Sequence, residues 1–207
     1  MFFKILPLLI FASAFAEEMI TTQYKGFNIT FPRNEQITVT KIVDGDTVHG
    51  VTSNKEKPEV RFHCIDTPES VLPSKEKGRR TVAQWHNGEN IGEKATNHIK
   101  TLIKVGDKVR LEHIKDKKGK WIDEYGRTLG VIWKGDLNIN LQMAQDGYAY
   151  EIPEYCSDIK YDYAIKSARS GKLGLYGIDG IEKMSIPDNF RKCINAGGTE
   201  KSCNPTK

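Results

Sequence analysis

The chain has 207 residues, which is enough for one domain with extensions or at most two small domains. Its 31 lysines and arginines stand against 27 aspartates and glutamates, and the formal net charge of +4 is too mild to indicate a nucleic-acid-binding surface by itself. Beyond residue 16 no stretch is apolar enough to cross a bilayer, so the pattern is not that of an integral membrane protein.

The first sixteen residues, MFFKILPLLIFASAFA, have the pattern of a secretory signal peptide. Lys4 precedes an apolar run, and Ala14-Phe15-Ala16 forms a small-x-small cleavage site. A membrane anchor is the weaker alternative, because spanning a bilayer takes about 20 apolar residues and this run is shorter. We therefore expect cleavage after Ala16, a periplasmic or secreted mature protein, and no stable membrane association after cleavage.

Strand patterns dominate the first half of the remaining sequence. After an N-terminal extension at residues 17–36, apolar and polar residues alternate over residues 37–43 and 47–53, and the Asp-Gly pair between them predicts a hairpin. Alternation returns in VRFHCI at residues 60–65. The polar stretch at 70–92 is longer than most structureless connections, so it is either functional or mobile. Its basic residues fit a solvated loop or a nucleic-acid guide, and both interpretations stay open: Lys75, Lys77, Arg79 and Arg80.

Helix patterns cover residues 92–106, 137–145 and 157–171, and strand patterns cover residues 107–116 and 127–136. Ser157 is the predicted N-cap of the last helix and Gly171 its predicted stop. Beyond Tyr176 the sequence reads as a loop. This order predicts an α+β fold, mainly a β barrel, in which five strands form an OB-type barrel with helices packed on it. The predicted domain covers residues 37–177, and a C-terminal tail covers 178–207.

Four cysteines permit three disulfide pairings in an exported protein. Cys193 and Cys203 lie ten residues apart in the polar tail, which makes them the most plausible pair. Cys64 lies in a predicted strand, where we expect a small core residue rather than a disulfide partner. The fourth is Cys156, and no Cys or His spacing indicates a zinc site.

Three short motifs place charged residues where strands begin or end. Asp46 follows the DG turn at the start of a strand, a position that disfavours aspartate. Arg61 lies inside the VRFHCIDTPE strand, and Asp66, Thr67 and Glu69 follow at its end. The proline after Thr67 favours an extended conformation that can direct the Thr67 carbonyl outward. Taken singly, each motif could be a turn, a strand cap or a solvated surface.

Together these residue types suit phosphodiester hydrolysis. Two aspartates and a carbonyl are hard oxygen ligands for calcium or magnesium. Arg61 and Arg127, the latter from the motif DEYGRTL, carry planar guanidiniums that match phosphate oxygens. A glutamate beside the ion can activate water.

The motifs VDGDT, VRFHCIDTPE and DEYGRTLG, in this order, resemble those of the staphylococcal nuclease family. The resemblance runs from about residue 37 to 176 and includes GYA at 147–149 and SGKLGLYG near its end. It implies an OB-fold barrel with three helices. It also implies a calcium-dependent endonuclease that acts on DNA and RNA and leaves 3′-phosphate ends.

The resemblance assigns roles to individual positions. Asp46 and Asp66 would be metal carboxylates, and Thr67 would offer its main-chain carbonyl to the ion. Glu69 would position or deprotonate water, while the phosphate-binding arginines would be Arg61 and Arg127. The remaining assignments are weaker: Asp44 behind the metal ligands, Tyr125 preceding Gly126 as in the family, and Tyr155 or else Tyr150 near the substrate. Glu124 departs from the family, in which a lysine precedes this tyrosine.

Other functional classes compete with this hypothesis. A catalytically silent nucleic-acid-binding OB module is the main alternative, and the complete set of five charged site residues argues against it. An oligosaccharide- or peptide-binding barrel would need clustered exposed aromatic residues, whereas Trp85, Trp121 and Trp133 are scattered. The five histidines form no recognised metal pair or nucleophile partnership. For the oligomeric state we assume a monomer.

Overall fold

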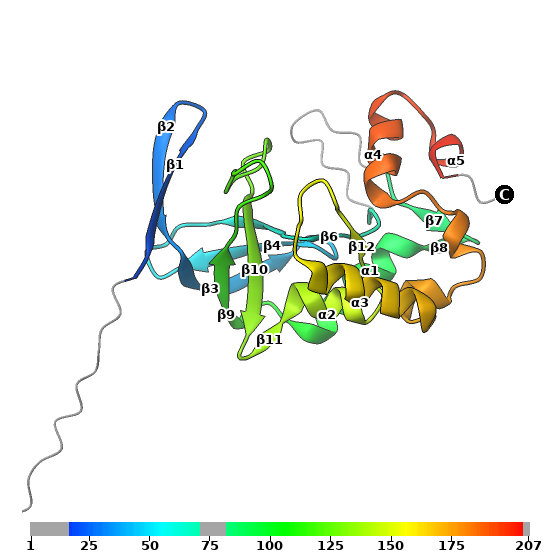
Figure 1. Cartoon of the computed structure of the whole chain (residues 1–207), viewed down its shortest axis with the longest axis horizontal. Coiled ribbons are helices and arrows are strands. Elements are labelled where there is room, and N and C mark those ends of the chain that lie inside the picture. The colour runs from blue at the N-terminus through cyan, green and yellow to red at the C-terminus, as the bar shows by residue number, and fades with distance from the viewer. Residues whose placement is uncertain (1–16, 71–81, 205–207) are drawn as a thin grey trace, which may run out of the picture.

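The computed structural model describes residues 17–70 and 82–204. The predicted signal peptide and the four basic residues of the 70–92 stretch lie outside these ranges. Residues 17–36, expected to be an extension, form a hairpin of β1 (Met19–Tyr24) and β2 (Phe27–Pro32) and the start of the next strand. The hairpin projects from one end of the molecule (Figure 1) and buries Ile20 and Phe31 against Trp121.

Five strands pair with one another in a closed circuit. They are β3 (Asn34–Ile42), β4 (Thr47–Thr52), β5 (Glu59–Phe62), β9 (Lys108–His113) and β10 (Thr128–Lys134). Each pairs with two of the others, in the order β3-β4-β5-β10-β9 and back to β3. Only the β5–β10 pair is parallel. The predicted Asp-Gly hairpin and the later pair of strands are therefore confirmed, and the circuit leaves few open edges.

Short strands connect this circuit to the helices. β6 (Ile65–Asp66) pairs with β12 (Tyr150–Glu151), and β11 (Leu137–Asn138) continues from β10. The second half of the 70–92 stretch contains a small hairpin, β7 (Trp85–His86) with β8 (Glu89–Asn90). That part of the chain is therefore ordered where the sequence suggested an irregular segment.

Three helices pack against the strand circuit, as expected: α1 (Ile91–Leu102), α2 (Ile139–Gln145) and α3 (Ile159–Ser170). Asn90 caps α1 with its side chain, and Gly171 ends α3 as predicted. The N-cap of α3 is Asp158, one residue after the expected Ser157. Buried residues of the circuit and of the three helices form one cluster, whose fully buried members include Ile37, Phe62, Ile99, Ile132, Met143 and Ile165.

The C-terminal segment corrects the expectation of a loop. After two short turns, η1 (Gly174–Gly177) and η2 (Ile181–Lys183), it forms α4 (Pro187–Asn195) and α5 (Glu200–Cys203). These two helices lie beside β7 and β8 at the end of the molecule opposite the β1–β2 hairpin (Figure 1). Phe190 and Ile194 are buried in a cluster of their own with Cys203. Sequence analysis missed this unit because its helices are short, and because Gly197 and Gly198 separate them, as in a loop.

Both disulfides are present. Cys193–Cys203 joins α4 to α5 and confirms the predicted pair. Cys64–Cys156 connects residues 92 positions apart and corrects the expectation that Cys64 is an unpaired core residue. Cys64 is buried as expected, but it lies in the turn between β5 and β6, where its positive φ of 70° directs it toward the segment that precedes α3.

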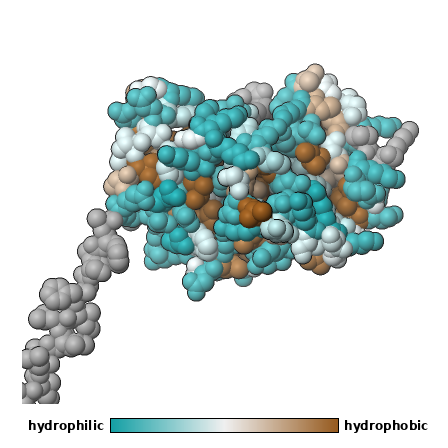
Figure 2. Space-filling model, in the orientation of Figure 1, coloured by the Kyte–Doolittle hydropathy of each residue, from teal (hydrophilic) through white to brown (hydrophobic). Residues whose placement is uncertain are grey.

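The outer face shown in Figure 2 is largely hydrophilic, with small, separated apolar patches. None of the helices within residues 17–70 and 82–204 combines the length and apolar character needed to cross a bilayer.

Candidate active site

The predicted acidic and basic residues meet where β4, β5 and β6 come together. Asp46 precedes β4, Arg61 is in β5, and Asp66 ends β6. Thr67 and Glu69 follow directly in the chain. Asp46, Arg61, Asp66 and Thr67 are each at least nine-tenths buried, although charged side chains rarely lie inside a protein unless they are paired. Their burial predicts strong internal pairing, which the contacts show.

Arg61 bridges the two aspartates. Its Nη1 lies 2.9 Å from Asp46 Oδ1, and its Nη2 lies 2.6 Å from Asp66 Oδ1. Nη1 also donates to the carbonyl of Ile65 at 2.9 Å. A planar guanidinium can make these contacts at once because its donors point in fixed directions. Arg61 thus holds together the two carboxylates to which the sequence assigned metal binding.

Thr67 locks Asp46 from the other side. Its backbone N–H donates to Asp46 Oδ2 at 2.6 Å, and its hydroxyl donates to the same oxygen at 3.0 Å. The approach depends on Gly45, because a Cβ there would lie 2.8 Å from Thr67 Oγ1. Hydrogen bonds between Asp46 and Thr67, 21 residues apart, therefore join the VDGDT and IDTPE motifs.

Glu69 reaches the same cluster from the segment after β6. Its backbone passes so close to α1 that a Cβ at Gly92 would lie 2.1 Å from the Glu69 carbonyl oxygen. The Gln84 side chain accepts a hydrogen bond from the Glu69 N–H at 3.2 Å. The carboxylate of Glu69 is thereby held near Asp66, and this proximity fits the role the sequence assigned to it.

A third guanidinium, which sequence analysis missed, completes the cluster. Arg191 of α4 contacts Asp66 with Nη1 to Oδ1 at 2.9 Å and Nη2 to Oδ2 at 2.7 Å. Its Nη1 also lies 2.7 Å from Glu69 Oε1. The sequence did hold a signal for α4: a proline at its first turn and the apolar pair Phe190 and Ile194 four residues apart.

Arg127 lies close to the cluster but is paired elsewhere. Its Nε donates to Asp123 Oδ2 at 2.7 Å, and the Asp123 carboxylate also accepts the Arg127 N–H at 2.9 Å. Burial opposes the charge of Arg127, yet Asp123 outweighs it and raises the pKa of the guanidinium, with Asp46 and Asp44 adding to the effect. The structure thus brings Arg127 near the aspartates while Asp123 orients it.

Burial and neighbouring charges shift the pKa values of the acids in this cluster. Burial raises the pKa of Asp44 well above its ordinary value, and the carboxylates of Asp46 and Glu69 raise it further. Burial also raises the pKa of Glu69, against the opposing effect of Arg191. Burial acts in the same direction on Asp46, but Arg61 and the Thr67 N–H more than offset it and lower the pKa of that carboxyl.

The donor types fit a hard divalent cation such as calcium or magnesium. Asp46 and Asp66 present buried carboxylate oxygens next to the main chain of Thr67, and calcium prefers oxygen ligands. Burial, and next the carboxylates of Asp46 and Glu69, raise the pKa of Asp44, and a bound cation would act in the opposite direction. Asp46, Asp66 and the Thr67 carbonyl are the atoms that would hold it.

The predicted tyrosines lie in different surroundings. Tyr125 is half-buried with the Arg127 guanidinium 5.5 Å from its ring centre, so it lies beside a proposed phosphate ligand. Tyr155 is exposed, and Lys118 lies over its ring. Tyr150 is buried in the cluster of Ile91 and Leu175, although it pairs with Asp66 across β12 and β6. Only Tyr125 is therefore placed directly at the arginines.

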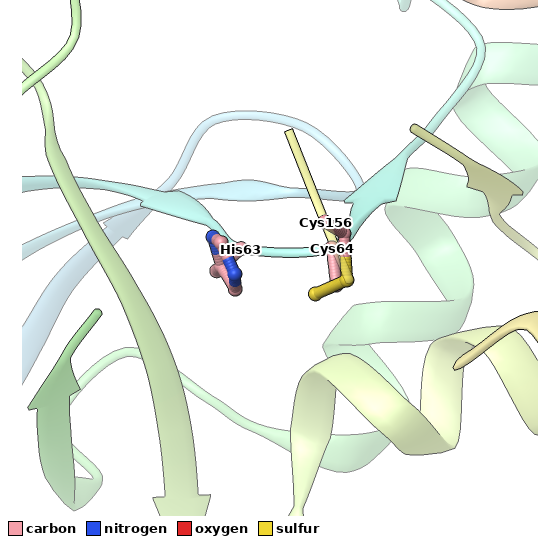
Figure 3. A group of neighbouring side chains, drawn as sticks. All are labelled: His63, Cys64 and Cys156. Carbon is pink, nitrogen blue, oxygen red and sulfur yellow. A yellow bond between two sulfur atoms is a disulfide. The ribbon is translucent and has the colours of Figure 1, made fainter. Parts of the chain in front are cut away.

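A second group of candidate ligands lies at the other side of the β5–β6 turn. His63, Cys64 and Cys156 have ligand atoms within 4.8 Å of one another (Figure 3). Both sulfurs are joined in the disulfide, so neither can offer a thiolate. Burial lowers the pKa of His63, which favours the neutral imidazole beside this disulfide. The two cysteines of this group therefore form a covalent link between the β5–β6 turn and the segment before α3.

Comparison with known proteins decides the family. Residues 59–177, more than half of the chain, match the family described as "Staphylococcal nuclease homologue". This chain belongs to that family. The membership confirms the resemblance predicted from the three motifs, although Asp46 precedes the matched range.

Named relatives support the same assignment. The chain is 32% identical to "Thermonuclease" of Staphylococcus intermedius over 137 residues, which cover 66% of this chain and 71% of the relative. It is 28% identical to "Thermonuclease" of Staphylococcus hyicus over 156 residues, covering 74% and 82%. "Endonuclease YhcR" of Bacillus subtilis (strain 168) is 30% identical over 159 residues, 74% of this chain but 12% of that relative. These names support the expectation of a phosphodiester-hydrolysing enzyme, and the roles of individual residues stay predictions.

Proposed function

We propose that this chain is an exported, calcium-dependent endonuclease that hydrolyses phosphodiester bonds of DNA and RNA and leaves 3′-phosphate ends. The observation that carries the proposal is the buried bridge from Arg61 to both Asp46 and Asp66, with Glu69 held beside them. Burying two carboxylates and a guanidinium adds little net stability, because the loss of hydration offsets their attraction. Such buried charged clusters are frequent at functional sites, and this one has the groups that phosphodiester hydrolysis needs. The closed strand circuit supports the OB-fold barrel as its scaffold.

In this function, bound calcium would supply positive charge beside the phosphate oxygens. Glu69 would accept the proton of a water whose oxygen attacks phosphorus in line with the 5′-oxygen. The bond from phosphorus to the 5′-oxygen breaks, that oxygen takes up a proton, and a 3′-phosphate and a 5′-hydroxyl result. The Arg61 and Arg127 guanidiniums would donate to the phosphate oxygens as charge develops on them.

Arg127 can keep its present partner in this role. Its Nε contacts Asp123 at 2.7 Å in the structure, and its Nη donors are the ones that a phosphate can take without breaking that pair. Asp123 would then act as the positioning residue that aims the guanidinium at the substrate. Tyr125 beside Arg127 is the proposed substrate contact, and Tyr155 a more distant one.

Two features support export and action as a monomer outside the cytoplasm. Both disulfides would persist in an oxidising compartment, as expected after removal of the sixteen-residue leader. All four cysteines are consumed in these bonds, so no thiol is left to link two copies. N-terminal sequencing of exported protein should give Glu17 as the first residue.

The decisive experiment incubates residues 17–207 with single-stranded DNA, double-stranded DNA and RNA in calcium, magnesium or chelator. A Glu69→Gln variant is the test, and Glu93→Gln on the exposed side of α1 is the matched control. Cleavage that requires calcium, survives in Glu93→Gln and collapses in Glu69→Gln would establish the reaction and its base. Binding without cleavage under every metal would favour the silent OB module instead.

A further inference from the structure

The C-terminal segment returns to the active site and places a cation on its carboxylates. Arg191 takes both oxygens of Asp66, at 2.9 and 2.7 Å, and also contacts Glu69 at 2.7 Å. The burial of Arg191 opposes its charge, but Asp66 and Glu69 outweigh it and raise the pKa of the guanidinium. Arg191 thus makes three charge-assisted hydrogen bonds to the two carboxylates, and its side chain is 30% exposed.

The segment that carries Arg191 is anchored independently of that ion pair. Gln84, whose carbonyl oxygen binds the Glu69 N–H, donates from its amide nitrogen to the Ser185 carbonyl at 2.9 Å. The Ser185 N–H donates to Asn204 Oδ1 at 3.1 Å, and Asn204 donates to the Trp85 carbonyl at 2.5 Å. These bonds fix Ser185 and Asn204, which flank α4 and α5, to Gln84 and to Trp85 at the start of β7.

Packing and a covalent bond set the orientation of α4. Phe190 and Ile194 are nearly fully buried on one side of the helix, and Arg191 projects from another toward the cluster. Cys193 is joined to Cys203, so α4 cannot rotate freely away from α5. Asp188, one turn earlier, approaches Arg191 at 3.6 Å. The arginine is thus preorganised by its own helix to reach the site.

Arg191 occupies the oxygens on which a metal ion would depend. Calcium takes its oxygen ligands at about 2.3–2.6 Å and uses the same lone pairs that a guanidinium donor uses. Within the described ranges, the ligand atoms of Asp46, Asp66 and Glu69 do not gather within 4.8 Å of one another, whereas those of the disulfide group do. In this arrangement the guanidiniums stand between the carboxylates.

We propose that Arg191 is a built-in competitor of the divalent cation: the C-terminal segment places it on Asp66 and Glu69, and it must leave Asp66 before the ion can bind there. The inference rests on the proposed calcium dependence. It adds that the segment after residue 177 sets the calcium concentration at which the site fills. Substrate phosphate, which offers Arg191 a new anionic partner, would favour its departure.

The test measures calcium binding directly, without substrate. Residues 17–207 carrying Arg191→Gln or Arg191→Ala are compared with the unchanged chain by calorimetric titration with calcium chloride. Lys192→Ala is the matched control, because Lys192 lies next along α4 and pairs only with Asp188 among the ion pairs of the described residues. Circular dichroism verifies that each variant is folded.

We expect the calcium Kd to fall by about tenfold in both Arg191 variants, since a charge-assisted competitor is lost, and to stay within twofold in Lys192→Ala. The calcium-dependent rise in the thermal midpoint should grow in parallel. An unchanged or larger calcium Kd in the Arg191 variants, or no calcium binding in any variant, would overturn the proposal. An unchanged Kd with a raised KM would instead identify Arg191 as a third phosphate ligand.

A separate cleavage assay keeps the two proposals apart. If the Arg191 variants bind calcium more tightly and no variant cuts nucleic acid, the nuclease function fails and the competition stands. If every variant cuts with the same calcium requirement, the competition fails and the nuclease stands.

Discussion

Two guanidiniums reach the same carboxylate, Asp66, from very different parts of the chain. Arg61 lies five residues before Asp66 in the barrel, is 8% exposed, and also binds Asp46. Arg191 lies 125 residues after it, in a helix that a ten-residue disulfide loop holds in place. The first lies in the strand circuit, and its loss would leave Asp46 and Asp66 buried without the cation that they share. The second is partly exposed and lies outside the strand circuit, so we expect its side chain to leave Asp66 more readily.

We expect the arginines of the strand circuit, Arg61 and Arg127, to contribute more to turnover than Arg191 does. Arg127→Lys should lower kcat by roughly 10²–10³-fold, because an ammonium cannot replace a guanidinium that donates to several phosphate oxygens while Asp123 holds it. Steady-state cleavage at saturating calcium measures the effect. Arg110→Lys, on the exposed side of β9, is the control and should keep its turnover.

A near-normal kcat in Arg127→Lys would remove this residue from the chemistry. It would also contradict the division of roles between the strand circuit and the C-terminal segment, since Arg191 would then be the remaining candidate for the second phosphate ligand.

Arg61 and Arg191 should also differ in how much they contribute to the free energy of unfolding. Arg61→Gln should lower the free energy of unfolding by about 3–5 kcal/mol, because it leaves Asp46 and Asp66 buried without their shared partner. Arg191→Gln should cost less than about 2 kcal/mol, since Asp66 keeps Arg61 and the lost side chain is partly solvated. Urea denaturation of both variants at one calcium-free condition measures the difference. Equal losses would show that Arg191 is as structural as Arg61.

The order of the strands and the clustering of most candidate site residues were predictable because their signals are local. The Asp-Gly pair fixes a hairpin, and the IDTPE segment follows directly on the strand that carries Arg61, so neighbouring sequence becomes neighbouring structure. The order of the motifs then placed Arg127 at the start of β10, whose parallel pairing with β5 brings it to the cluster.

The parts that were missed depend on contacts between distant residues. Cys64 has the alternation of a strand residue, and nothing local distinguishes a buried thiol from half of a disulfide with Cys156. Arg191 lies in a nine-residue helix whose docking is decided by Gln84 and Ser185, more than a hundred residues away from each other. The tail's composition resembles a loop because the helices are short and their core is small.

The smallest predicted effect is on the calcium Kd when the Cys193–Cys203 disulfide is removed. Cys193→Ser with Cys203→Ser should lower the calcium Kd by roughly threefold, because α4 then samples positions in which Arg191 is off Asp66. The same pair of serines introduced into Arg191→Gln should change the Kd no further, since the competitor is already absent. Calcium titrations of the four proteins complete this double-mutant cycle. An additive effect would mean that the disulfide influences calcium binding by a route other than Arg191. Another residue of the C-terminal segment would then have to account for that influence.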